Sequence, residues 1–244
     1  SYQLDNSKPA VQALKMGDSV TDTFTVTSAD GTTLQVTVSV TGKDDGAVIG
    51  GVDTDAVSED VNVAAGQLQA TGQLTITDPD AGQDHFTAKT DLVSGLGIGH
   101  FSIDATGYWA YAADNTQPAI QQLKAGESLT DTLTVVSVDG TLHTITVTIQ
   151  GTNDAPLLQA QTQAVSEDGA LLQGQMVATD VDAGDTQAFS VAQPVDGFTL
   201  NTDGSYQFDP AHVSYQQLAA GQTLDVVIPV TATDSAGATS TQNL

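Results

Sequence analysis

Residues 33–41 read Thr-Leu-Gln-Val-Thr-Val-Ser-Val-Thr, and their strict alternation of apolar and polar side chains decides the fold class. A period of two places the apolar side chains on one face of a β-strand and the polar side chains on the other. Threonine also favours the pleated, half-exposed surface of a strand. Residues 20–26 follow the same pattern, and no long stretch of the chain has a helical period. The sequence therefore predicts an all-β fold.

An internal repeat at an offset of 109 residues defines the domain organisation. The segment Tyr2-Gln-Leu-Asp-Asn-Ser-Lys-Pro-Ala is matched by Tyr111-Ala-Ala-Asp-Asn-Thr-Gln-Pro-Ala, and the correspondence continues as far as Gly42 and Gly151. A third, weaker copy follows, in which Ser-Glu-Asp and Asp-x-Asp-Ala-Gly recur within 166–184. Fixed-period self-similarity is typical of chains built from repeated structural units. We therefore expect tandem domains in an extended arrangement.

The repeats place the domain boundaries. Residues 1–51 are predicted to form the C-terminal half of one repeat plus a linker, 52–156 a complete repeat, and 157–244 a third repeat truncated at its C-terminus. Short strands at regular spacing with Gly and Asp turns predict Ig-like or cadherin-like β-sandwiches. In the complete repeat we expect strands near 48–57, 71–77, 85–93, 98–103, 107–113, 129–138 and 141–150. Residues 1–51 should supply only the last three strands, so the apolar face of 24–36 should pack on another chain or on residues outside this sequence.

Composition excludes several classes of partner. The net charge is −25, 27 of the 30 acidic residues are Asp, and the five basic residues are all Lys. Nucleic-acid binding requires a basic surface, which this chain lacks, and acidic lipid surfaces are disfavoured for the same reason. No apolar run approaches the roughly 18 residues of a membrane span, so direct membrane insertion is not expected. Cysteine is absent, which leaves a packed core or a bound metal to supply stability.

The acidic residues collect where neighbouring repeats meet. Because each strand crosses from one pole of a sandwich to the other, the linker at 42–46 should share a pole with residues 78–80 and the turn at 139. The segment 58–60, the turn at 114 and the linker at 151–156 should share the opposite pole. Each linker thus brings oxygen ligands together from two repeats. Crowded carboxylates repel one another, and this chain has no Arg to neutralise them, so a divalent cation would relieve the repulsion.

We therefore predict Ca²⁺ at these junctions, because Ca²⁺ takes six to eight oxygen ligands in flexible geometry. Magnesium and transition metals fit less well, given flexible oxygen donors and no histidine cluster. The alternative interpretation is that these residues are solvated turn formers, which is the ordinary role of an Asp in a loop. The candidate ligands are Asp44, Asp45, Glu59, Asp78, Asp80, Asp114, Asp139, Asn153, Asp154, Asp180, Asp182 and Asp234.

Several of these segments resemble a known family. Asp114-Asn, Thr130-Asp-Thr-Leu-Thr-Val, Val138-Asp-Gly-Thr and Gly151-Thr-Asn-Asp-Ala-Pro are similar to the VCBS repeat of giant bacterial adhesins exported by type I (RTX-type) secretion. The Ser-Glu-Asp, Asp-x-Asp-Ala-Gly and Asn-Asp-Ala-Pro motifs also resemble cadherin-type calcium junctions. This resemblance implies an extracellular, cell-surface location, calcium-dependent rigidity and a role in adhesion or biofilm formation.

The expected function is a calcium-rigidified structural extender, or stalk, of a bacterial cell-surface adhesin. Two alternatives stay open: a module of the same adhesin that binds a glycan or a protein, and accessory domains of a secreted enzyme. We predict no enzymatic activity, because nucleophile-elbow, zinc-protease and phosphate-loop motifs are absent. Trp109, the only Trp, is expected to be a core or edge aromatic rather than a sugar platform. The partners expected are neighbouring repeats within a monomeric chain, and the adhesion target is not encoded in these motifs.

Overall fold

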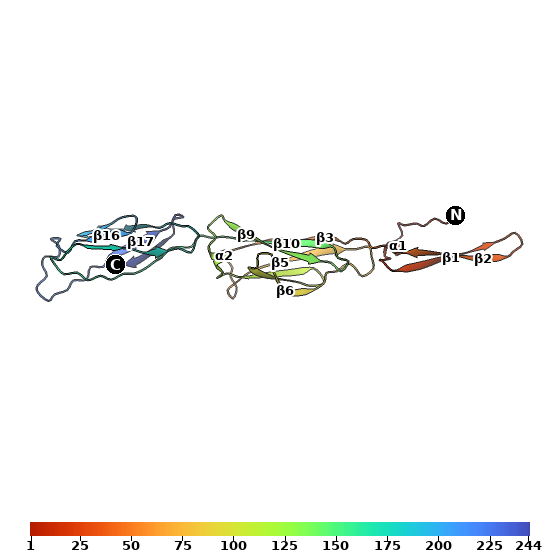
Figure 1. Cartoon of the computed structure of the whole chain (residues 1–244), viewed down its shortest axis with the longest axis horizontal. Helices are drawn as coiled ribbons and strands as arrows, with labels where there is room; N and C mark the ends of the chain where they lie inside the picture. The colour runs from red at the N-terminus through yellow and green to blue at the C-terminus, as the bar shows by residue number, and fades with distance from the viewer. The chain divides into compact units, whose positions relative to one another are not determined.

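The computed structural model describes all 244 residues, and nearly all of its regular structure is β (Figure 1). Its two helices, α1 (Pro9–Gln12) and α2 (Pro118–Gln121), are four residues long. No helix is both long enough and apolar enough to span a membrane. The chain divides into two compact units, one made of Ser1–Asn115 with Leu129–Ile149 and the other of Thr116–Ser128 with Gln150–Leu244.

The first unit contains a β-sandwich. One sheet has five strands in the order β3-β5-β8-β7-β6, and the other has three in the order β4-β10-β9. The strands are β3 (Val48–Gly51), β4 (Thr54–Ser58), β5 (Gln67–Thr77), β6 (Lys89–Val93), β7 (Gly99–Ile103), β8 (Tyr108–Asp114), β9 (Ser128–Val136) and β10 (Leu142–Gln150). The all-β prediction is confirmed.

The core of this sandwich comes from alternate positions of its strands. On β8, Trp109, Tyr111 and Ala113 are buried, whereas the intervening Ala110 and Ala112 face the other side of the sheet. The Trp109 indole N–H donates to the Val52 carbonyl at 2.7 Å, so Trp109 is a core residue as expected. A polar ring atom inside a core needs such a partner. Alternation along a strand therefore generates both the packed interior and a free outer face.

One predicted strand is wrong. The stretch 48–57 forms two strands, because β3 pairs with β5 in the five-stranded sheet while β4 belongs to the other sheet. Gly51 ends β3 with φ +95°, a conformation that non-glycine residues rarely adopt. A β-carbon there would also lie 2.5 Å from the Gln73 carbonyl oxygen. The chain thus changes sheets at a glycine that alternation alone does not mark.

The N-terminal segment forms a two-stranded sheet, not the three strands expected. Strands β1 (Ser19–Thr27) and β2 (Thr33–Thr41) pair antiparallel, with Phe24 opposite Val36 and Val26 opposite Leu34. Phe24, Val26 and Leu34 are exposed. The first residues form no strand, although the Tyr2 hydroxyl donates to Asp22 at 3.2 Å, as the equivalent Tyr111 hydroxyl does to Asp131 at 3.0 Å. That this apolar face is covered by further residues stays a prediction.

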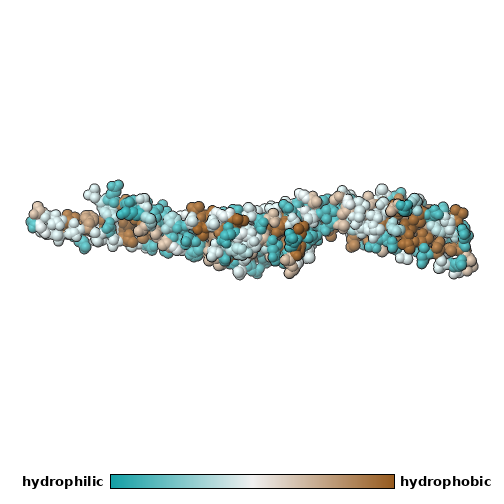
Figure 2. All heavy atoms as spheres, turned by 180° about the vertical axis from the view of Figure 1, so that it is seen from behind, coloured by the Kyte–Doolittle hydropathy of each residue, from teal (hydrophilic) through white to brown (hydrophobic).

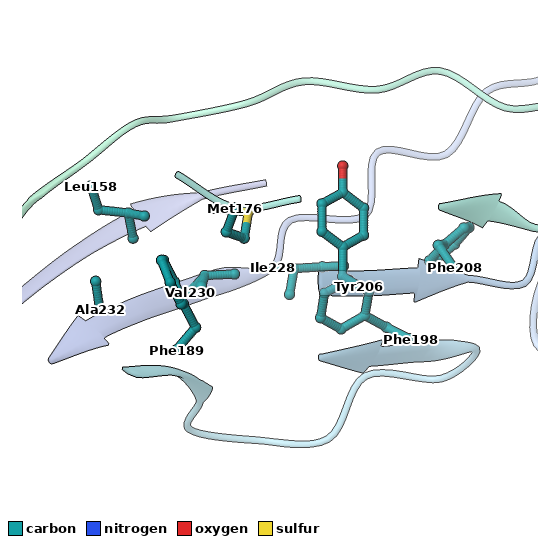
Figure 3. Packing of buried hydrophobic residues seen from close by; sticks show 9 residues of the cluster. All are labelled: Leu158, Met176, Phe189, Phe198, Tyr206, Phe208, Ile228, Val230 and Ala232. Atoms are coloured by element: carbon teal, nitrogen blue, oxygen red, sulfur yellow. The ribbon is translucent and has the colours of Figure 1, made fainter. Parts of the chain in front are cut away.

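The second unit contains three small sheets, β12-β16-β15, β14-β17-β18 and β11-β13. Its strands are β11 (Leu157–Leu158), β12 (Leu172–Gln175), β13 (Ala178–Thr179), β14 (Ala188–Val191), β15 (Phe198–Leu200), β16 (Ser205–Phe208), β17 (Pro229–Thr233) and β18 (Thr239–Asn243). Nine buried side chains form its core, among them Tyr206 and Val230, which project between the strands (Figure 3). Long irregular segments leave other apolar residues of this unit exposed. Hydrophobic surface gathers over this unit, at the right of Figure 2.

Candidate cation sites at the two linkers

The first linker, residues 42–47, is hydrogen-bonded to the loop that follows β5. The Asp45 backbone N–H donates to the Asp80 carboxylate at 2.7 Å, and the Ala47 N–H donates to Asp139 at 2.8 Å. Asp139 lies in the turn between β9 and β10 and also accepts bonds from Ser137 and Thr141. The predicted meeting of this linker with residues 78–80 and 139 is present in the first unit.

Two carboxylate oxygens at this linker are buried without a hydrogen-bond partner. They are Asp78 Oδ2 and Asp80 Oδ1, and Asp80 as a whole is 1% exposed. Burial raises the pKa of Asp78, and the charges of Asp139, Asp80 and Asp44 raise it further. A buried carboxylate without a partner is costly. The loop thus concentrates negative charge that the protein's own groups do not fully compensate.

Asp139 behaves differently from Asp78. Burial alone would raise the pKa of Asp139, but hydrogen bonds from Ser137, Thr141 and the Ala47 N–H outweigh burial and lower it. Its two oxygens are therefore used to close the β9–β10 turn and to hold the linker.

A glutamine completes the first linker site. Gln83 is buried, and its side-chain N–H₂ group donates to Asp44 Oδ1 at 2.9 Å and to Asp80 Oδ2 at 3.2 Å. An amide group can donate two hydrogen bonds without carrying charge. Gln83 therefore ties the linker carboxylate to the loop carboxylate within the protein itself.

The second linker, residues 151–156, has the same arrangement in the second unit. The Asp154 N–H donates to Asp182 Oδ2 at 3.0 Å, matching the bond from Asp45 to Asp80. The Asn153 side chain donates to Asp234 Oδ2 at 2.8 Å, and this bond lowers the pKa of Asp234. Asp234 also accepts the N–H groups of Gly237 and Ala238 and so closes its own turn, as Asp139 does.

An acidic cluster lies beside the second linker. Asp180, Asp182 and Asp185 each place a carboxylate oxygen within 4.8 Å of the others. Asp180 Oδ2 and Asp182 Oδ1 are buried without a hydrogen-bond partner, and Asp182 is 3% exposed. Burial raises the pKa of Asp182, and the charges of Asp180 and Asp185 add to this, against the lowering effects of the Asp154 N–H and Lys124.

The Asp-x-Asp-Ala-Gly loop beside each linker is also anchored by backbone groups at equivalent positions. The Ala81 N–H donates to the Ala13 carbonyl at 3.3 Å, and the Ala183 N–H donates to the Gln122 carbonyl at 3.1 Å. Ala13 and Gln122 are related by the 109-residue offset. The Asp-x-Asp-Ala-Gly loop is therefore fixed both to the linker and to the short helical turn that precedes it.

The glycine that opens each linker is required by close packing. A β-carbon on Gly42 would lie 2.3 Å from the Leu14 carbonyl oxygen, and one on Gly151 would lie 2.4 Å from the Leu123 carbonyl oxygen. The Gly42 N–H donates to the backbone carbonyl of Asp18 at 2.9 Å, and the Gly151 N–H donates to the backbone carbonyl of Glu127 at 3.0 Å. The two linkers therefore have the same local geometry as well as related sequences.

The opposite end of the first sandwich holds the remaining predicted ligands. Asp60 and Asn115 are joined by two hydrogen bonds, from the Asp60 N–H at 3.1 Å and from the Asn115 side chain at 2.5 Å. Glu59 is fully buried, and Asp114 ends β8 opposite Gln67. The structure thus brings the Ser-Glu-Asp segment and the turn at 114–115 together, as strand parity predicts.

Two functional residues were missed by sequence reasoning. Gln83 and Asp185 occupy the same place, three residues after the second Asp of each Asp-x-Asp-Ala-Gly motif. The sequence signal is that both residues directly follow an Asp-x-Asp-Ala-Gly motif. Gln83 is uncharged, so a pattern of carboxylates does not include it. The half-buried His143 places Nε2 3.1 Å from an Asp53 carboxylate oxygen, a contact that the sequence does not indicate.

The chemistry of these sites suits a hard cation. All candidate ligand atoms are oxygens. The buried carboxylate oxygens without hydrogen-bond partners lie in loops whose backbone N–H groups donate to the other carboxylate oxygens. Ca²⁺ is the ordinary ion for such donor sets, because it accepts flexible oxygen coordination that Mg²⁺ does not.

Comparison with known proteins gives two findings. Residues 153–244 match the family model of a bacterial Ig domain. Among solved structures, mouse cadherin-23 EC22-24 is similar at 18% identity and a TM-score of 0.47, covering 93% of this chain and 72% of that one. Mouse protocadherin-24 EC1-3 is similar at 17% identity and a TM-score of 0.46, covering 100% of this chain and 80% of that one. No curated protein matches the chain.

The match to a bacterial Ig domain agrees with the all-β architecture seen directly in the strands, and it indicates no catalytic family. The family match covers residues 153–244 and does not extend over residues 1–152.

Proposed function

We propose that this chain is a structural segment of an extracellular bacterial surface protein, in which Ca²⁺ holds each linker against the repeat that follows it. The stalk of an adhesin is the role that this organisation serves best. Repeats with separate cores act as spacers, and their use as spacers depends on how firmly the linkers are held. The bacterial Ig match of residues 153–244 supports the extracellular location.

The single observation that carries the calcium proposal is the set of buried carboxylate oxygens without partners. Both copies of the Asp-x-Asp-Ala-Gly loop contain them at the same positions, Asp78 and Asp80 in one and Asp180 and Asp182 in the other. A solvated turn former keeps its oxygens in water, whereas these oxygens are removed from water. The repeated orphaned atoms therefore favour bound cations over simple turn formation.

The proposed ligands differ in role. Asp78 and Asp80 would bind the ion at the first linker, and Asp180, Asp182 and Asp185 at the second. Asp139, Asn153 and Asp234 hold the linkers through hydrogen bonds. A bound Ca²⁺ would neutralise the carboxylates and lock the loop, so its contribution is structural. Adhesion or biofilm formation would follow from the parent protein that such a stalk supports.

The test is thermal unfolding with and without calcium. Extracellular calcium modules bind with dissociation constants on the order of 10⁻⁴–10⁻³ M. At about 10 mM Ca²⁺ each site should then add about 1.4–2.7 kcal/mol of stability. Sodium chloride at matched ionic strength should give a much smaller effect, because it only screens charge. An equal gain from sodium would reduce the calcium proposal to screening.

An isosteric double variant separates a ligand role from a structural one. Asp180→Asn with Asp182→Asn keeps the oxygens that accept the Asp182 and Asp154 N–H groups but removes both charges. We expect the calcium-free protein to melt higher, because buried charge is removed, and the calcium response of this linker to disappear. The control is Asp203→Asn with Asp225→Asn, which removes two exposed charges from the same repeat. A response to calcium that survives in the first variant would contradict the proposal.

A further inference from the structure

The outer face of the five-stranded sheet contains a trough built by its central strand. Ala110 and Ala112 of β8 face outward, and the flanking strands present larger side chains on the same face. Thr71 and Ser102 lie on either side of Ala110, and Gln69 and His100 on either side of Ala112. Small residues between two rows of larger ones leave a hollow of about 430 Å³. That volume falls within the usual range for small-molecule sites, roughly 300–1,000 Å³.

The alanines are not explained by folding. Alanine is depleted in β-strands, and these positions contribute nothing to the core that Trp109 and Tyr111 form. Residues that break a local preference without a packing gain are candidates for a functional role. The two alanines do one thing that larger residues would not, which is to keep the trough open.

The third repeat carries larger side chains at the centre of the equivalent face. There Gly174 lies against the buried Tyr206 ring as Gly72 lies against Trp109, which aligns Gln207 with Ala110. Gln207 stands between Gln173 and Thr199 and fills the centre of the face. Ser205 likewise replaces Tyr108. The small central residue and the aromatic ring at this face are therefore features of the second repeat that the third does not share.

The rim of the trough combines one aromatic ring with neutral hydrogen-bonding groups. Tyr108 is 47% exposed at one end. Gln69, Thr71 and Ser102 each offer a donor and an acceptor. Opposite them, Asp91 Oδ1 lies 2.7 Å from His100 Nδ1, and Asp91 has φ +57° at an irregularity in the pairing of β6 with β7. Such irregularities re-aim side chains, here toward the trough.

We propose that this trough binds a neutral, unbranched oligosaccharide. A sugar ring presents an apolar C–H face, which can stack on Tyr108, and a rim of hydroxyls, which need both donors and acceptors. An extended peptide fits less well, because β8 is a central strand whose backbone groups are already paired with β5 and β7, so strand addition is blocked. An anionic ligand would meet Asp91 and a chain of net charge −25.

The experiment is an NMR titration of the ¹⁵N-labelled chain with cellohexaose and, separately, maltohexaose, each up to about 20 mM. Millimolar affinity is the expected range for an open site with one stacking ring, equivalent to about −4 kcal/mol. We expect saturable amide shifts on β5, β7 and β8 at the trough with at least one of the two hexamers. The absence of saturable shifts at these strands with both hexamers would overturn the proposal.

Variants taken from the third repeat make the test specific. Ala110→Gln should fill the trough and weaken binding at least tenfold while the melting temperature stays the same, since Gln207 is accepted at the equivalent place. Tyr108→Ser should remove the stacking ring and have a similar effect. The matched control is Thr144→Gln, which adds the same side chain to an exposed position of β10 and should leave binding intact. Unchanged affinity in Ala110→Gln would show that the shifts arise elsewhere.

Discussion

The two linkers share one framework and differ in how they handle charge. In both, a backbone N–H of the linker binds the second Asp of an Asp-x-Asp-Ala-Gly loop, and the loop alanine binds a carbonyl of the preceding helical turn. At the first linker, Gln83 donates two hydrogen bonds to the carboxylates around it. At the second, Asp185 adds a further carboxylate. The two linkers thus share their backbone contacts and differ in one side chain, which under the calcium proposal decides how strongly each site depends on a cation.

This comparison predicts that the first linker is held partly by the protein itself and the second mainly by its ion. A hydrogen bond to a charged group contributes about 1.5–3 kcal/mol, so Gln83 supplies part of what a cation would. Asp185 does the opposite, because it increases the repulsion in the calcium-free state and the affinity for the ion.

The largest effect is expected from closing the space at the linker glycines. Gly42→Ala and Gly151→Ala each place a methyl group at 2.3–2.4 Å from a backbone carbonyl oxygen. Overpacking of this kind costs about 1–3 kcal/mol. Chemical denaturation should show similar losses for the two variants, with and without calcium. A loss confined to one linker would break the claim that the framework is shared.

A reciprocal exchange at the position of Gln83 and Asp185 should give the next largest effect. Gln83→Asp should destabilise the calcium-free first unit by about 1–3 kcal/mol and increase its response to calcium. Asp185→Gln should weaken calcium binding at the second linker about tenfold, or about 1.4 kcal/mol. Calorimetric titration of each variant measures both changes. Exchange of the two residues without a change in either response would show that the difference between the linkers lies elsewhere.

The smallest effect concerns pH, and it should be similar at both linkers. The pKa values of Asp78 and Asp182 are raised in the folded protein, chiefly by burial. Without calcium, the stability that these groups contribute is present below the ordinary aspartate pKa of about 3.9 and is lost as pH rises through the raised values. With calcium the direction reverses, because the ion binds the ionised form. The stabilisation by calcium should therefore shrink as pH is lowered toward these pKa values, which melting curves at fixed calcium would measure.

Much of the fold could be predicted from the sequence, because alternation and repeats report directly on strands. The strands of the complete repeat lie close to their predicted positions, and Trp109 lies in the core. The division of 48–57 into two strands could not be predicted, since it depends on the close approach of Gly51 to Gln73. The apolar face of β1 and β2 was expected to need a cover from outside this sequence, and what covers it could not be predicted, because alternation identifies an apolar face but not the segment that packs on it.

The candidate sites were predicted in outline and missed in detail. The pairing of each linker with its Asp-x-Asp-Ala-Gly loop follows from strand parity. The roles of Asp139 and Asp234 as turn-closing acceptors depend on neighbouring N–H groups that only coordinates reveal. Gln83 shows the general limit, since a residue can determine the charge balance of a site by donating hydrogen bonds while carrying no charge of its own.

The contacts that anchor each linker are made largely by backbone groups, and this has a consequence for how such a protein can change over generations. The backbone carbonyls of Ala13 and Gln122 accept the N–H of the loop alanine at the first and second linker. The backbone carbonyls of Asp18 and Glu127 accept the N–H of the glycine that opens each linker. A joint of this kind is indifferent to most substitutions on either side of it. Whole repeats can therefore be duplicated, deleted or exchanged by recombination without new complementary mutations. The length of such an array could then vary while the backbone contacts at each linker stay the same.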